Sequence, residues 1–226
     1  MVYRKRNNKK GVVMAKLTPY SEYKEARARA QKLIYDVRRH SSINKHYKFV
    51  IRPIGSQSRR CVIKDNHGKY DLDYQIILTK NSKDGDSDPT AIKKAFLRAF
   101  TDCRNNNERI EDSTTVVTVR CSKNPGKFDA SKEKFSFDFV IISIDEEKRI
   151  RRNGKSEYTW NELPSRNTYI YDRYKRLSAV QQRDLFENHL IPRIINEKQK
   201  NESLRCPSID LFYQEVNNYY QRNKLQ

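Results

Sequence analysis

The chain has 226 residues, enough for one sizeable catalytic domain with a small appendage, and it contains no apolar run long enough to cross a bilayer. Its formal net charge is +19, and residues 1–60 carry most of the excess, with 17 Lys and Arg against 3 Asp and Glu. The lack of an apolar run predicts a cytoplasmic protein with no membrane partner. The concentration of positive charge in one segment predicts a polyanion-binding surface. The four cysteines are widely spaced and form no CxxC pair, so zinc is not expected.

The N-terminal quarter predicts a basic arm followed by a basic helix. Residues 1–16 have the composition of a flexible arm, and Thr18-Pro19 predicts an N-cap and first helical residue for a helix over 19–39. Apolar residues at helical spacing form one face of this segment. The other face carries the predicted nucleic-acid-binding residues Lys24, Arg27, Arg29, Lys32, Arg38 and Arg39. The alternative interpretation is a solvated face that only aids solubility.

The middle of the chain alternates strand and helix patterns. Asp88-Pro89 begins a helix with an apolar stripe, and Asn153-Gly154 between charged, alternating flanks predicts a type I′ hairpin. Runs rich in β-branched and aromatic residues predict strands at 47–54, 70–78, 114–121 and 135–144.

Helical patterns dominate after residue 177. They predict helices over 177–198, kinked at Pro192, and over 208–222. The order of elements indicates an α+β fold with a mixed β-sheet flanked by helices and a small helical C-terminal lobe. We divide the chain into an arm at 1–16, a catalytic core at 17–160 and a helical lobe at 161–226.

Three aspartates interrupt apolar strands. Side chains alternate along a strand, so Asp71 and Asp73 point to the same face, and Asp138 lies in a second apolar strand. Strands are depleted in Asp, and neighbouring carboxylates repel each other unless a cation lies between them. Oxygen ligands suit Mg²⁺, so the pattern predicts two Mg²⁺ or Mn²⁺ ions and phosphoryl-transfer chemistry. Taken alone, however, a DxD pair is more often the solvent face of a strand.

The dipeptide Gly55-Ser56 follows a predicted strand. Glycine lets a phosphate approach the backbone, and backbone N–H groups with the Ser56 hydroxyl can donate to its oxygens. These residues are the predicted nucleotide-binding segment. The common alternative is an ordinary turn.

Together, Ile54-Gly55-Ser56, Asp71-Leu72-Asp73 and the distant Asp138 resemble the signature of the DNA polymerase β-type nucleotidyltransferase superfamily. The later hairpin and the helix beginning at Pro207-Ser208 are similar to the branch that contains oligoadenylate synthase, cyclic GMP-AMP synthase and bacterial cyclic-oligonucleotide synthases. The resemblance implies catalytic and metal-binding roles for the three aspartates. It also implies that Ser208 contacts the triphosphate.

The implied activity is transfer of a nucleoside monophosphate from a nucleoside triphosphate, with ATP as the expected donor, to a ribose hydroxyl. A cyclic or linear oligonucleotide second messenger is the first expectation for the product, with RNA or DNA as a partner that activates the enzyme. Two alternatives stay open: an enzyme that adds nucleotides to RNA or tRNA, and a non-catalytic nucleic-acid-binding protein on the same fold.

Overall fold

The computed structural model describes residues 16–58, 62–65, 67–79, 88–124, 126–163, 167–200 and 208–225. It divides into two compact units. The sheet unit comprises Thr18–Val62 and Lys69–Arg166, and the helical unit comprises Met1–Leu17, Ile63–Gly68 and Asn167–Gln226. The predicted arm at residues 1–15 lies outside the described residues.

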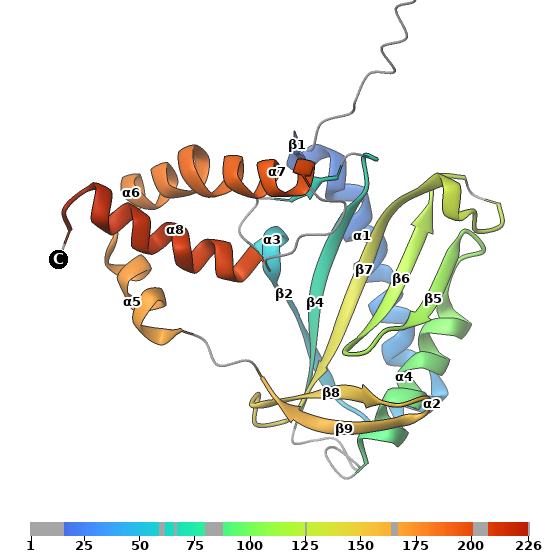
Figure 1. Ribbon diagram of the computed structural model, residues 1–226. Helices are drawn as coiled ribbons and strands as arrows, with labels where there is room; N and C mark the ends of the chain where they lie inside the picture. Colours follow the sequence, from blue (N-terminus) through green and yellow to red (C-terminus); the bar gives the residue numbers. More distant parts are fainter. Residues whose placement is uncertain are drawn as a thin grey trace, which may run out of the picture. The chain divides into compact units, whose positions relative to one another are not determined.

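A seven-stranded mixed sheet forms the centre of the sheet unit. The strand order is β2-β4-β7-β6-β5, with the β8–β9 hairpin attached to β7, and only the β4–β7 pair is parallel (Figure 1). The strands are β2 (Phe49–Pro53), β4 (Tyr70–Leu78), β5 (Glu108–Asp112), β6 (Val116–Ser122), β7 (Glu133–Ile142), β8 (Lys148–Asn153) and β9 (Glu157–Glu162).

Helices cover one face of this sheet. They are α1 (Tyr20–Arg39), α2 (Ser41–Asn44) and α4 (Pro89–Cys103), and α1 and α4 lie behind the strands in Figure 1. The α4 helix begins as the sequence predicts, because the Asp88 side chain accepts a hydrogen bond from Thr90 N at 2.8 Å. Apolar residues of α1 and α4 form one core with Leu72, Phe137 and other inward-facing strand residues. This packing leaves the opposite face of the sheet for Asp71, Asp73 and Asp138.

Two short helices lie in the connections of the sheet unit. The α3 turn (Gly55–Ser58) follows β2, and the 3₁₀ turn η1 (Ala130–Lys132) precedes β7. Because α3 lies directly after β2, the predicted Gly55-Ser56 segment sits at the end of a strand that pairs with β4.

The helical unit packs its helices around a separate core that includes Leu185, Phe212 and Val216. A two-stranded pair, β1 with β3, also belongs to it. Its elements are β1 (Lys16–Leu17), β3 (Ile63–Lys64), α5 (Thr168–Arg176), α6 (Ala179–Asp184), the π-helical segment η2 (Leu185–Leu190), α7 (Ile191–Lys200) and α8 (Ser208–Arg222). No helix in the described ranges is both long and apolar enough to span a membrane.

Two local predictions are wrong. The α1 helix has Pro19 rather than Thr18 as its N-cap, because Thr18 N donates to Val62 O at 2.7 Å and the backbone there is still extended. The hairpin has three loop residues, 154–156, between the paired residues Asn153 and Glu157, so the two-residue type I′ turn does not form. The predicted helix over 177–198 is confirmed as a continuous helical stretch over 179–200, and its irregular, π-helical part η2 lies immediately before Ile191 and Pro192.

Candidate active site

The three aspartates gather on one face of the sheet. Asp71 and Asp73 lie on β4, and Asp138 lies on β7, which pairs with β4 in parallel. The register places Asp73 directly opposite Asp138 and Asp71 directly opposite Ser136. Asp71 is exposed, while Asp73 and Asp138 are half-buried, and Leu72 between the two β4 aspartates is fully buried on the other face. Pairing of these strands therefore brings together carboxylates that are 65 residues or more apart in the sequence.

Hydroxyl groups on neighbouring strands engage two of these carboxylates. The Ser136 hydroxyl donates to Asp71 Oδ1 at 2.5 Å, and the Thr118 hydroxyl donates to Asp138 Oδ1 at 2.7 Å. Ser113 Oγ lies 3.0 Å from Thr118 Oγ1. Both donors are buried, so each carboxylate has one fixed contact from the sheet itself.

Gly55 lies against the third carboxylate. Its φ of +63° is in the left-handed region, and a Cβ at this position would overlap Asp73 Oδ2 and lie 3.2 Å from Asp73 Cγ. The surrounding backbone is tied to Asp73, because Ile54 N and Gln57 Nε2 both donate to Asp73 O, at 2.9 Å and 2.5 Å. A residue with a side chain at position 55 would therefore meet both a strained backbone and the Asp73 carboxylate.

Burial raises the pKa of the Asp138 carboxyl, and the negative charge of Asp71 raises it further, while the Thr118 hydrogen bond opposes the shift. The positive charge of Arg120 on β6 also opposes the upward shift of the Asp138 pKa. Arg120 Nε lies 2.7 Å from Glu111 and its Nη1 lies 2.8 Å from Glu133. Because Arg120 is held between two glutamates, most of its charge is compensated there. A cation bound between the aspartates would lower the free energy of their ionised forms.

The arrangement of strands and helices matches solved structures of DncV from Vibrio cholerae. The structure of the DncV cyclic AMP-GMP synthase with nonhydrolyzable GTP matches with a TM-score of 0.54 at 12% sequence identity, covering 85% of this chain and 52% of that chain. The DncV di-nucleotide cyclase in complex with GTP and 5MTHFGLU2 matches with a TM-score of 0.53 at 13% identity, covering 86% and 54%. The 3′-deoxy ATP-bound form gives 0.51 at 15% identity, covering 86% and 52%.

This chain has the nucleotidyltransferase fold. The resemblance that the sequence motifs indicate is thus confirmed at the level of the fold, as are the mixed sheet flanked by helices and the helical C-terminal region. The chain spans about half the length of the solved structures that it matches. No protein-family model and no curated protein sequence matches it.

Within the nucleotidyltransferase fold, the three aspartates fit a magnesium site in donor type and in strand register. All three supply carboxylate oxygens, which Mg²⁺ prefers, from one face of two adjacent strands. In their present side-chain conformations, however, the described residues form no group of three or more His, Cys, Asp or Glu that could hold a metal ion. Ions between them therefore require the carboxylates to turn toward one another.

The nucleotide-binding predictions fall in both units. Gly55 and Ser56 begin α3, in the sheet unit that also contains the aspartates. Ser208 is the first residue of α8 in the helical unit, and its side chain lies outside the described residues. Contact of Ser56 and Ser208 with a triphosphate stays a prediction.

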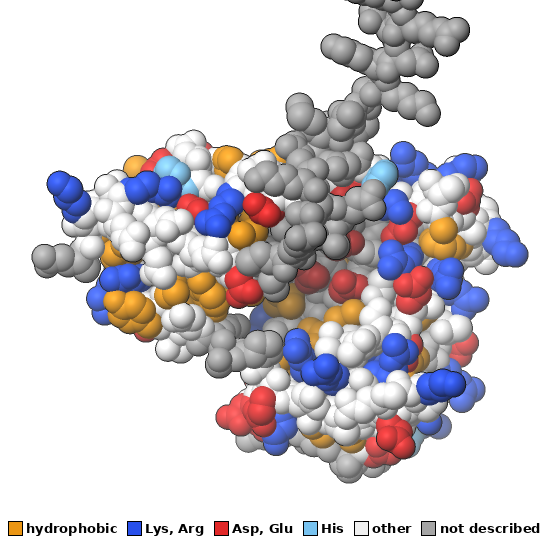
Figure 2. Space-filling view, in the orientation of Figure 1, with side chains coloured by type: hydrophobic (Ala, Val, Ile, Leu, Met, Phe, Trp, Pro, Cys, Tyr) orange, Lys and Arg blue, Asp and Glu red, His pale blue; other side chains and the backbone are white. Residues whose placement is uncertain are grey.

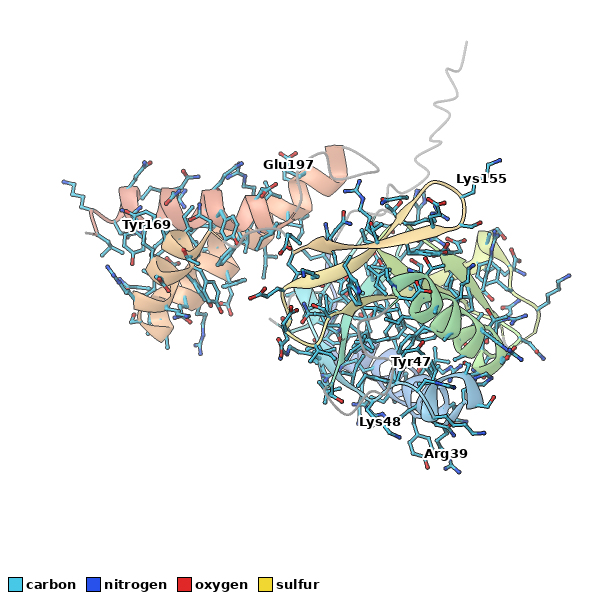
Figure 3. All side chains as sticks on the ribbon, turned by 90° about the horizontal axis from the view of Figure 1, so that it is seen from below. Arg39, Tyr47, Lys48, Lys155, Tyr169 and Glu197 are labelled. Carbon is cyan, nitrogen blue, oxygen red and sulfur yellow. The ribbon has the colours of Figure 1, made fainter. Side chains whose placement is uncertain are left out.

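The basic face of α1 is mostly accessible. Lys24, Lys32, Arg38 and Arg39 are exposed, and in Figure 3 the Arg39 side chain extends outward from the ribbon. Arg38 and Arg39 also lie over the rings of Phe49 and Tyr35, at 5.0 Å and 5.3 Å. On the face drawn in Figure 2, basic and acidic side chains are interspersed over the sheet unit.

Two arginines of this face are less accessible than the four exposed residues. Arg29 makes a bidentate ion pair with Glu108, with both N···O distances 2.6 Å and side-chain exposures of 15% and 2%. It is therefore committed to a contact inside the fold and is not available to a phosphate. Arg27 is half-buried, with its guanidinium 5.5 Å from the centre of the Tyr20 ring.

Ser136 and Thr118 are not among the predicted site residues. Ser136 lies two positions before Asp138 on the same strand, so alternation alone places both on the face that carries the aspartates. The partner of Thr118 follows from the antiparallel register of β6 and β7, which no local pattern specifies.

Proposed function

We propose that the chain is a nucleotidyltransferase whose active site is the face of the sheet formed by Asp71, Asp73 and Asp138. The observation that carries this proposal is the register that sets Asp73 opposite Asp138, with Asp71 on the same face and Gly55 against Asp73. The nucleotidyltransferase fold supports it further.

In the proposed reaction, a ribose hydroxyl attacks the α-phosphorus of a nucleoside triphosphate. A new phosphodiester bond forms, the bond between the α-phosphorus and its bridging oxygen to the β-phosphorus breaks, and pyrophosphate leaves. Two Mg²⁺ ions, when bound, supply charge neutralisation of the triphosphate and of the attacking oxygen.

The residues of this chain have separate roles in the proposal. Asp71 and Asp73 would hold the ions, and Asp138 would complete the site and accept the proton of the attacking hydroxyl. Gly55 lets the Asp73 carboxylate lie where a Cβ would otherwise be, and the backbone N–H groups of this segment and the Ser56 hydroxyl would donate to the β- and γ-phosphates.

We propose an oligonucleotide second messenger as the product, because the matched structures include one described as a cyclic AMP-GMP synthase. The exposed residues Lys24, Lys32 and Arg39 support a nucleic acid bound along α1. In a messenger synthase this nucleic acid is an activator, whereas in an RNA-modifying enzyme it is the substrate.

Incubation with α-³²P-labelled nucleoside triphosphates and Mg²⁺, with and without RNA and DNA, distinguishes these products. The proposal predicts label in small oligonucleotides that mass spectrometry identifies. Label found only in the added RNA would show that the enzyme modifies RNA and does not make a messenger. Absence of any labelled product with Mg²⁺ or Mn²⁺, under every nucleic-acid supplement, would contradict the proposed function itself.

A further inference from the structure

Two buried hydroxyls occupy positions on the catalytic face where the sheet register aims them at carboxylates. Ser136 is the cross-strand partner of Asp71 between β4 and β7, and Thr118 is the cross-strand partner of Asp138 between β6 and β7. Ser136 is 3% exposed and Thr118 is 6% exposed. A buried hydroxyl is costly without a hydrogen bond, and each of these has a carboxylate oxygen as its acceptor.

The direction of these hydrogen bonds follows from the chemistry of the groups. An ionised carboxylate only accepts, so the Thr118 hydroxyl must donate its one proton to Asp138 Oδ1. The Thr118 oxygen is then free to accept from Ser113, whose Oγ lies 3.0 Å away. Ser113, in the turn between β5 and β6, Thr118 on β6 and Asp138 on β7 thus form a chain of hydrogen bonds that all donate toward the carboxylate. Ser136 gives Asp71 the equivalent single contact.

From this geometry we propose that Thr118 and Ser136 are positioning residues for the catalytic carboxylates, an inference that rests on the proposed function. Each hydroxyl engages Oδ1 of its aspartate, and a carboxylate has a second oxygen with its own lone pairs. The hydroxyl would hold the carboxylate at Oδ1, and a turn of the carboxylate about this contact would make Oδ2 available to a bound ion. Hydrogen-bond partners of metal ligands commonly change metal affinity or activity by about 10–100-fold when removed.

The alternative is that both hydroxyls only fill space in the sheet. Thr118→Val separates the two ideas, because valine keeps the branched shape and the preference for strands and removes only the hydroxyl. Ser136→Ala does the same at the second position. Thr118→Ser restores a hydroxyl without the methyl group. Thr159→Val is the matched control, since Thr159 lies on β9 and its hydroxyl accepts from Asn153 and Asn161 rather than donating to a carboxylate.

The test measures Mn²⁺ binding by calorimetry, nucleotide turnover as a function of Mg²⁺ concentration, and thermal unfolding. We expect Thr118→Val and Ser136→Ala to weaken Mn²⁺ binding or lower kcat by about 10–100-fold, with Thr118→Ser close to the wild type. Thr159→Val should match the wild type in metal binding and turnover.

Two results overturn the inference in distinguishable ways. If the wild type binds Mn²⁺ and turns over nucleotides, and Thr118→Val and Ser136→Ala do so equally well, the hydroxyls only fill space. A loss in Thr118→Val that Thr118→Ser does not reverse leads to the same conclusion. If the wild type neither binds Mn²⁺ nor consumes any nucleoside triphosphate, the proposed function fails and the positioning role fails with it.

Discussion

Gly55→Ala tests the contact between the predicted phosphate-binding segment and the Asp73 carboxylate, which we propose is catalytic. The substitution adds a Cβ where Asp73 Oδ2 already lies, so the Asp73 carboxylate or the α3 backbone must move by roughly 1 Å to restore an ordinary contact distance. Misplacement by about that distance can reduce turnover on the order of 100-fold. The φ of +63° adds a backbone cost of about 1–2 kcal/mol in the free energy of unfolding.

Gly154→Ala is the matched control. Gly154 also has a left-handed φ, of +74°, but a Cβ there meets no atom within 4 Å. Chemical denaturation should therefore show a loss of about 1–2 kcal/mol in Gly154→Ala and at least as large a loss in Gly55→Ala, where the contact with Asp73 adds to the backbone cost. Nucleotide turnover should fall only in Gly55→Ala. The reasoning is refuted if Gly55→Ala keeps a turnover within threefold of Gly154→Ala.

Three further predictions address the rest of the sheet unit. Burial lowers the pKa of Lys93 to about 8, so stability should rise between pH 8 and 10.5, where the unfolded chain keeps a proton that the folded protein releases. Denaturation curves should show a gain of up to about 3 kcal/mol in the free energy of unfolding across that pH range, and Lys93→Met should lack this gain. An equal dependence of stability on pH in both proteins would contradict the prediction. Arg29→Ala should cost about 3 kcal/mol in stability, because it leaves Glu108 buried and unpaired, and a loss under 1 kcal/mol would show that the pair is dispensable. Replacing Lys24 and Lys32 with Ala should reduce the slope of log DNA affinity against log salt concentration by the equivalent of about two phosphate contacts. An unchanged slope would mean that this face does not bind DNA and contributes only to solubility.

Local patterns predict much of the fold. The strand at 70–78 and the helix at 208–222 have the predicted bounds, because an uninterrupted alternation and a clear apolar stripe specify each of them. Alternation alone also places Asp71 and Asp73 on one face. These features depend only on residues close in the sequence.

Features that depend on distant residues were not predictable in this way. The β5 strand (Glu108–Asp112) is strongly charged and has no strand pattern, and its first residue, Glu108, is buried with Arg29 as its ion-pair partner. Arg29 is predicted as part of the basic face because its partner, Glu108, is distant in the sequence. The opposition of Asp73 and Asp138 depends on a parallel register between strands joined by a long connection, which the motif order implies but periodicity cannot fix.

Pyrophosphate release is the most direct test of the central claim that the three aspartates form a nucleotidyl-transfer site. Asp73→Asn and Asp138→Asn keep the size of the side chain and remove its charge. With Mg²⁺, nucleoside triphosphates and nucleic acid, the wild type should release pyrophosphate, and either variant should do so at least about 100-fold more slowly. Equal rates in the wild type and both variants would contradict the account.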